Sequence, residues 1–297
     1  MAYQGSITRL PIGNDGMNGT ENLDLMAPDQ LENAKNVSFA FGGITKEGGT
    51  AALNASALGS PSPVIGGWDW WPDTSLQRTI VLCSNGAAYR DTGAGTFGTT
   101  LTTGKSWTTT TVPVFVESGK EAAASNKKLY IFTGTDQVQV LSGDGTTVAD
   151  IGANKPADWG TSYPVCGANH LGRLWGAGNA NDPHRLYYST ITDTEDFQNT
   201  GSGTVAIFPG EGTKIVAMAS FYGLLLVWKF PRGLYAVDTT DASASNWIVR
   251  RVSGSIGGAS PRCWCFMDDS SGVKVLFMSP DGNFHTAQTT DAYGSIA

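Results

Sequence analysis

A hairpin signature that recurs about every 50 residues constrains this fold more than any other feature of the sequence. Each copy has an apolar run, a turn rich in Gly, Asn, Asp or Pro, and a second run with an aromatic or β-branched residue, which is typical of a β-hairpin. Five copies begin at residues 78, 127, 172, 222 and 273. A period of this length indicates a repeat architecture, in which each unit buries its apolar face against the next.

Further candidate strands flank each hairpin. One precedes every copy, over residues 64–71, 114–124, 163–170, 214–221 and 262–267. Another follows each of the first four copies, near residues 107–112, 145–151, 204–208 and 247–252. Four strands in about 50 residues match one blade of a β-propeller. Because the chain also has 38 glycines and only 15% charged residues, we predict an all-β propeller of five four-stranded blades.

The fifth unit has no candidate fourth strand of its own. The stretch Gly42–Leu53, before the first blade, has a strand-like pattern, so we expect it to complete the last blade, close the ring and remove an open sheet edge. Six blades would result if residues 1–60 contained more strands. We expect residues 1–40 to form an extended arm with one short helix over Pro28–Lys35, and residues 41–297 to form the propeller. The sequence leaves open whether the arm packs on a neighbouring subunit or on its own propeller.

The chain is acidic, with a formal net charge of −7 and a pI of about 4.9. Such a surface repels phosphate, which argues against sequence-specific DNA binding but fits the wall of a channel through which DNA slides. We expect no membrane segment, because no apolar run approaches the ~20 residues that span a bilayer, and no secretory signal. The cysteines, Cys83, Cys166, Cys263 and Cys265, are interpreted as reduced and buried in preference to metal or redox roles.

No short motif in the sequence indicates a cofactor or a metal. Gly93–Gly98 matches G-x-G-x-x-G, but the Thr-rich sequence after it disfavours the helix that a nucleotide site requires. We therefore interpret it as a turn. The three histidines, His170, His184 and His285, lack the spacing of metal ligands, so we expect neither a metal nor a cofactor.

The aromatic and acidic residues of the apolar runs have a structural and a functional interpretation. Trp175, Trp228 and Trp264 lie inside these runs, and we expect them to be wedges between blades rather than a sugar-stacking surface. Asp69 lies among tryptophans in a candidate innermost strand and could act in glycoside cleavage. Because no second acid is identified at an equivalent position, we interpret it as a rim residue.

Three longer stretches carry a more specific pattern. The first is Asn22–Val37 with Gly42–Thr50, the second joins Gly172–Gly178, Asp182–Ser189 and Asp193–Phe197, and the third joins Gly212–Ile215, Leu224–Lys229 and Gly233–Tyr235. In content and order they resemble a family of bacteriophage propeller proteins found in tail nozzles, necks and hub complexes, sometimes labelled phage stabilisation proteins. This chain has Lys35 where the family usually has Arg, and Glu47-Gly48 where it usually has Arg-Pro.

The resemblance implies a non-enzymatic structural protein of the virion, made in the host cytoplasm and located in the neck or tail. As a nozzle, hub or stopper-like part it would extend or close the DNA conduit and lie near DNA without specific binding. Its partners would be portal, adaptor or tail proteins, with copies of the chain in a symmetric ring. By the same resemblance, the assembly interface of the arm is predicted at Leu25, Leu31, Asn33 and Ala34.

The alternative function is a carbohydrate-binding or glycoside-cleaving propeller. A lectin would need one pocket signature in each blade, and a glycosidase would need two acids that converge on the channel. The sequence analysis identifies neither feature.

Overall fold

The structure is a computed structural model that describes residues 37–40, 43–46, 63–72, 75–92, 96–101, 107–108, 111–118, 127–143, 145–269 and 272–288. The chain divides into two compact units, residues 1–55 and 56–297. In the first unit, β1 (Val37–Ala40) pairs with β2 (Gly43–Lys46) as an antiparallel hairpin. The second unit is a five-bladed β-propeller.

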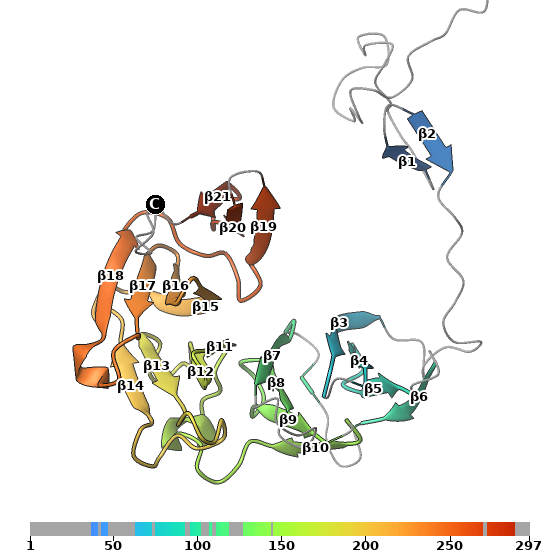
Figure 1. Cartoon of the computed structure of the whole chain (residues 1–297), viewed down its shortest axis with the longest axis horizontal. Coiled ribbons are helices and arrows are strands. Elements are labelled where there is room, and N and C mark those ends of the chain that lie inside the picture. The colour runs from blue at the N-terminus through green and yellow to red at the C-terminus, as the bar shows by residue number, and fades with distance from the viewer. Residues whose placement is uncertain are drawn as a thin grey trace, which may run out of the picture. The chain divides into compact units, whose positions relative to one another are not determined.

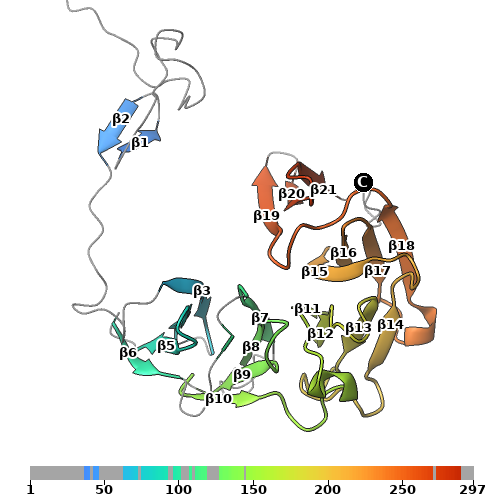
Figure 2. The ribbon, with the colours of Figure 1, turned by 180° about the vertical axis from the view of Figure 1, so that it is seen from behind.

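The five sheets of the second unit follow one another in chain order around a ring, as Figure 1 and, from behind, Figure 2 show. Blade 1 contains β3 (Val64–Trp70), β4 (Arg78–Cys83), β5 (Ala88–Asp91) and β6 (Phe97–Thr100). Blade 2 contains β7 (Val114–Ser118), β8 (Lys128–Phe132), β9 (Gln139–Ser142) and β10 (Thr147–Asp150). Blade 3 contains β11 (Cys166–His170), β12 (Arg173–Ala177), β13 (Arg185–Tyr188) and β14 (Gly203–Ala206).

The last two blades continue the same antiparallel order. Blade 4 contains β15 (Lys214–Phe221), β16 (Leu224–Phe230), β17 (Leu234–Asp238) and β18 (Ile248–Ser253). Blade 5 has three strands within the described residues: β19 (Trp264–Asp269), β20 (Gly272–Met278) and β21 (Phe284–Ala287). Short 3₁₀ turns, η3 (Ala157–Gly160) and η4 (Ala244–Asn246), lie in two of the connections.

This arrangement confirms the predicted repeat and all five hairpins. The first blade departs from the prediction, because its fourth strand is Phe97–Thr100 and not the stretch near 107–112. Trp107 in that stretch is instead buried in the core between blades 1 and 2, where its backbone N–H donates to the carbonyl of Gly86. The β-branched residues of this stretch favour a strand, but burial of the Trp107 indole holds it as part of the connection between blades 1 and 2.

Within the described residues, which end at 288, blade 5 has three strands, so the absence of a fourth strand stays a prediction. The segment expected to supply that strand pairs, over Gly43–Lys46, with Val37–Ala40. Closure of the ring by this segment therefore stays a prediction. The helix predicted over Pro28–Lys35 lies outside the described residues, and residue 40, the predicted end of the arm, is the last residue of β1.

Four hydrophobic cores lie between successive blades, which is how a propeller buries sheets that are each apolar on both faces. The core between blades 3 and 4 contains Trp175, and the one between blades 4 and 5 contains Trp228 with Trp264 packed against it. The cores of the other two joints contain Trp70 and Trp159. The prediction that Trp175, Trp228 and Trp264 act as wedges is confirmed.

Candidate functional site

The innermost strands run in the same direction around the ring, which gives the propeller two chemically different faces. We call the side on which β3, β7, β11, β15 and β19 begin the start face, and the side on which they end the end face. Adjacent strands meet in this parallel sense: the ring Nδ1 of His170, at the end of β11, lies 2.8 Å from the Oγ of Ser220 near the end of β15. Candidate residues near the ring centre are therefore described separately for the start face and the end face.

Carboxylates mark the ends of three innermost strands on the end face: Asp69 in β3, Glu117 in β7 and Asp268 in β19. Asp69 is exposed and accepts hydrogen bonds from Gln77 Nε2 (2.5 Å) and Thr79 Oγ1 (3.2 Å). Glu117 accepts one from Trp68 Nε1 at 2.7 Å. The interpretation that no second acid occupies an innermost strand is therefore wrong, and Glu117 was visible within the candidate strand 114–124.

A hollow on the start face lies around Lys214 and Phe230. One part, of about 650 Å³, is bounded by His184, Phe230 and Pro231, and an adjoining part of about 350 Å³ is bounded by Val165, Ile215 and Pro261. Lys214 and Phe230 border both parts, and the Lys214 ammonium lies 5.9 Å from the centroid of the Phe230 ring. The lining combines apolar walls with the Lys214 ammonium, and the His184 ring at its border lies 3.2 Å from the Asp182 carboxylate, so the hollow suits an apolar group with an acidic neighbour near Lys214. No local sequence pattern indicates this hollow, because its lining comes from three blades.

A buried lysine lies next to the connection between β14 and β15, part of which also lines the hollow. The Lys229 side chain is fully buried, and its Nζ donates to the carbonyl of Phe208 (3.0 Å) and lies 3.5 Å from the Glu211 carboxylate. Burial lowers the pKa of Lys229, and Glu211 opposes that change. The pKa of Glu211 is lowered, first by the hydrogen bond from the Tyr235 hydroxyl and then by the charge of Arg251. The network fixes a connection that contains a positive-φ residue, Phe208.

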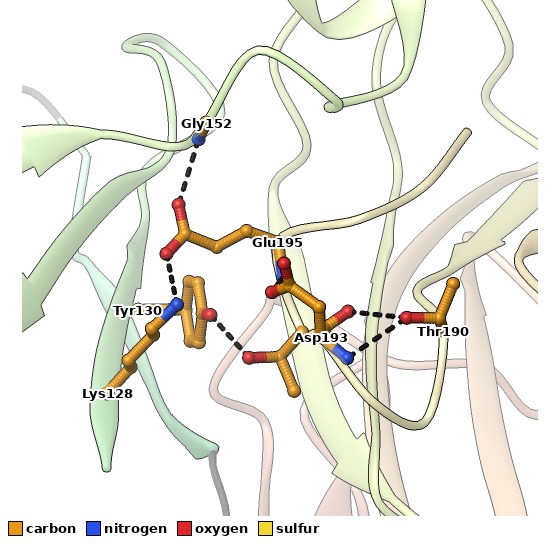
Figure 3. Close-up of polar contacts among 7 residues, drawn as sticks. Lys128, Tyr130, Gly152, Thr190, Asp193 and Glu195 are labelled. Atoms are coloured by element: carbon orange, nitrogen blue, oxygen red, sulfur yellow. Dashed lines mark hydrogen bonds and ion pairs between the residues drawn. The ribbon is translucent and has the colours of Figure 1, made fainter. Parts of the chain in front are cut away.

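A second polar cluster fastens blade 3 to blade 2 (Figure 3). The connection between β13 and β14, which we call the clasp loop (residues 190–199), reaches across the joint. Its Glu195 pairs with Lys128 of β8 at 2.5 Å and accepts the N–H of Gly152 at 3.0 Å. Thr194 exchanges a hydrogen bond of 2.7 Å with the hydroxyl of Tyr130 in β8.

The clasp loop is also braced internally and anchored in the core. The Thr190 hydroxyl donates to the carbonyl of Asp193 and accepts its N–H, each at 3.0 Å (Figure 3). The Phe197 N–H donates to the carbonyl of Asn154, and the Phe197 ring packs against Trp159 with centroids 4.9 Å apart. Asp193–Phe197, one of the stretches that carries the family resemblance, thus forms an inter-blade fastening.

The cysteines follow the prediction with one exception. Cys83, Cys166 and Cys263 are buried free thiols, whereas Cys265 is exposed. Cys263 immediately precedes the first residue of β19. The expected burial of Cys265 is wrong, because its strand neighbour Trp264 occupies the face that packs on blade 4.

The remaining sequence motifs have local explanations. Phe97–Thr100, at the end of the G-x-G-x-x-G match, is the strand β6 and not a helix. His170 is buried and bonded to Ser220 and Thr239, and burial lowers its pKa to about 4. Within the part of the chain that the structure describes, no three His, Cys, Asp or Glu residues are grouped as a metal site. No helix of that part is long and apolar enough to cross a membrane.

The four residues predicted as an assembly interface, Leu25, Leu31, Asn33 and Ala34, lie outside the described residues. Their role stays a prediction.

Comparisons with known proteins add the following. No protein-family model matches this chain, and no curated protein matches it. Among solved structures, it is similar to BBS1N in complex with ARL6DN (TM-score 0.48, 9% identity), covering 77% of this chain and 66%, just under two thirds, of that one. It is also similar to the Cps50 (Swd1) β-propeller domain of Myceliophteria thermophila (TM-score 0.44, 11% identity, 78% and 70% covered). A third is YCF48 bound to D1 peptide (TM-score 0.40, 11% identity, 67% and 57% covered).

Proposed function

We propose that this chain is a structural protein of a bacteriophage neck or tail, which extends or closes the DNA conduit and contacts neighbouring virion proteins. The observation that carries the proposal is the ordered resemblance of three sequence stretches to phage propeller proteins. The third stretch of this resemblance includes Leu224–Lys229 of β16, and part of the second, Asp193–Phe197, lies in the clasp loop. These residues serve packing between blades, which suits a mechanical role.

Construction of the joints supports this role. A virion connector must carry load from packaged DNA without opening, so its repeated units need strong lateral contacts. Each of the four described joints contains a buried core with at least one tryptophan. The joint between blades 2 and 3 has the clasp in addition. Large aromatic side chains supply much of the packing energy of such a joint.

Charge supports the part of the proposal that concerns DNA. The carboxylates of Asp69, Glu117 and Asp268 lie at the ends of innermost strands, and the whole chain has a net charge of −7. Negative charge close to the ring centre repels a phosphate backbone, so DNA would pass without being held.

Reconstitution with neighbouring proteins tests this function. The chain would be co-expressed with the products of the adjacent open reading frames, and particles would be imaged by electron microscopy with this chain labelled. We expect several copies in a ring on the axis of a portal, adaptor or tail assembly. A chain that stays unincorporated in the presence of a complete portal and tail set would contradict the proposal.

The arm can be tested in the same assay. Substituting the predicted interface residues Leu25 and Leu31 by Asp should leave the circular dichroism of the propeller unchanged while incorporation is lost. Normal incorporation of this variant would remove the arm from the interface.

A glycoside-cleaving propeller is the second candidate, and one observation favours it. Asp69 and Glu117 lie in neighbouring innermost strands, with Trp68 donating to Glu117 and stacking on Phe115 at 5.9 Å. Two acids beside an exposed aromatic ring are the components of a sugar-cleaving site. Hydrolysis of aryl glycosides that disappears in both Asp69→Asn and Glu117→Gln would establish this function in place of the structural one.

A further inference from the structure

Two neighbouring blades end their innermost strands in the same unusual turn. His170 pairs with Arg173, and Phe221 pairs with Leu224, so each hairpin loop has two residues. These are Leu171-Gly172 and Tyr222-Gly223, and all four residues have positive φ, of 48° and 74° in the first loop and 46° and 77° in the second. Positive φ at both positions is the geometry of a type I′ hairpin.

Leucine and tyrosine are poor residues for the first position of such a turn. Asn, Asp and Gly are preferred there, because a larger side chain brings Cβ too close to the backbone. Bulky residues in the left-handed region often indicate a functional role, because they persist against the local preference. Here the same exception occurs in two adjacent blades, on the same face.

The two side chains belong to one exposed apolar surface on the end face. Leu171 is 51% exposed and Tyr222 is 59% exposed. Ile191 lies beside the first loop, with its Cγ2 3.8 Å from where a Cβ on Gly172 would be. Phe266 of blade 5 joins through Phe221, whose ring is stacked on it and edge-on to Tyr222. We call Leu171, Ile191, Tyr222 and Phe266 the tip patch.

Exposed acidic residues lie on the same face as the tip patch. Asp193, Asp241 and Asp268 are exposed on connections or strand ends of the same face. Arg173, the cation nearest in sequence to Leu171, is turned away: its guanidinium donates to the carbonyl of Ser189 and lies over the Trp247 ring. A partner for this patch therefore needs an apolar recess with positive charge around it.

The hollow on the start face has these properties. Phe230 and Pro231 give it apolar walls, the Lys214 ammonium borders it, and the exposed Arg232 follows Pro231 directly. Its two parts, of about 650 and 350 Å³, could take one apolar side chain each. Because the hollow and the tip patch lie on opposite faces, one copy of the chain cannot bring them together.

We propose that the tip patch of one copy binds in the hollow of a second copy, head to tail. Leu171 and Tyr222 would enter the apolar hollow, and the acids around them would lie near Lys214 and Arg232. A contact between two different surfaces is heterologous, so it leaves one free tip patch and one free hollow in every dimer and can propagate. The contact belongs to the purified chain alone and does not require the virion role.

Sedimentation velocity on the full chain tests the interface. We expect the wild type to form dimers and larger species as its concentration is raised, and to dissociate when salt is added, since part of the attraction is between exposed charges. The tip variant, Leu171→Asn with Tyr222→Asn, and the hollow variant, Lys214→Glu, should each weaken self-association by about tenfold or more. Ile248→Asn, at an exposed position on the outermost strand of blade 4, is the control and should associate like the wild type.

Mixing the two variants distinguishes a heterologous contact from a symmetric one. The tip variant retains its hollow and the hollow variant retains its tip patch, so the mixture should form dimers that neither forms alone and that do not grow further. A wild type that is monomeric at all concentrations, a tip variant that associates normally, or a mixture without dimers would each overturn the proposal. Circular dichroism of both variants, matched to the wild type, confirms that they fold.

Discussion

The indole rings of Trp228 and Trp264 stack almost parallel across the joint between blades 4 and 5, with centroids 6.2 Å apart and an interplanar angle of 4°. Trp228 belongs to β16, and Trp264 is the first residue of β19. Trp228 is fully buried, and its ring also contacts that of Phe277 at 5.5 Å. One indole therefore joins the second strand of one blade to the first two strands of the next.

Truncating this indole should destabilise the propeller strongly. Trp228→Ala removes a fully buried side chain and leaves a cavity at a joint, for which we expect a loss of about 3 to 5 kcal/mol in the free energy of unfolding. Urea unfolding followed by circular dichroism measures it. Ile248→Ala, at a position 47% exposed, should change stability by less than about 0.5 kcal/mol. Equal effects of the two variants would show that the joint does not depend on Trp228.

The clasp between blades 2 and 3 should contribute a measurable but smaller coupling. Lys128 and Glu195 are each 23% exposed, so water screens their attraction in part. In a double-mutant cycle with Lys128→Met and Glu195→Gln, we expect a coupling energy of about 0.5 to 1 kcal/mol. A coupling of zero would mean that Glu195 acts through its bond to Gly152 and not through the lysine.

The buried Lys229 should depend on its carboxylate partner. Glu211→Gln leaves a fully buried ammonium without its counter-charge, and breaking a buried pair in this way typically costs about 3 to 5 kcal/mol. Because Glu211 is 27% exposed, we expect a loss nearer about 2 kcal/mol. Adding Lys229→Met to this variant should recover part of the loss, since the unpaired charge is then removed. A double variant less stable than Glu211→Gln would contradict this explanation.

Stability should fall between pH 6.5 and pH 4 because of His170. Its folded pKa is lowered to about 4 by burial, whereas an unfolded histidine titrates near 6.5. In that window the unfolded chain binds a proton that the folded chain does not, so acid favours unfolding, by up to about 3 kcal/mol at the low end. Unfolding curves for the wild type and His170→Gln across this range should differ in slope. Parallel curves would show that His170 does not titrate as described.

Features of the fold can be predicted from the sequence when the residues that form them are close together along the chain. The repeat and its hairpins are local patterns, so the ring of blades could be predicted. The clasp joins Lys128 to Glu195, 67 residues apart, and no local pattern pairs them. The exposure of Cys265 depends on which face of β19 packs on blade 4, and the alternation of residues along the strand does not determine that.

The site was predicted less well for the same reason. Asp69 stands out in the sequence because tryptophans flank it, whereas Glu117 in the candidate strand 114–124 has no such neighbours. The hollow is lined by residues of three blades. The tip patch depends on positive φ angles at Leu171 and Tyr222, which the residue types at these positions do not indicate. Both surfaces are formed by residues that come together only when the blades pack beside one another.

Relieving the two strained turns should stabilise the monomer. An ordinary residue in the left-handed region costs about 1 to 2 kcal/mol, whereas Asn tolerates it. We therefore expect Leu171→Asn and Tyr222→Asn each to raise the free energy of unfolding by about 0.5 to 1 kcal/mol, measured by urea unfolding of dilute protein. Leu171→Ala removes the same apolar contacts but keeps the strain, so it should bring no gain. If Leu171→Asn and Leu171→Ala both lowered the free energy of unfolding by the same amount, Leu171 would contribute to packing within the fold. Its position in a strained, exposed turn would then no longer support a binding role.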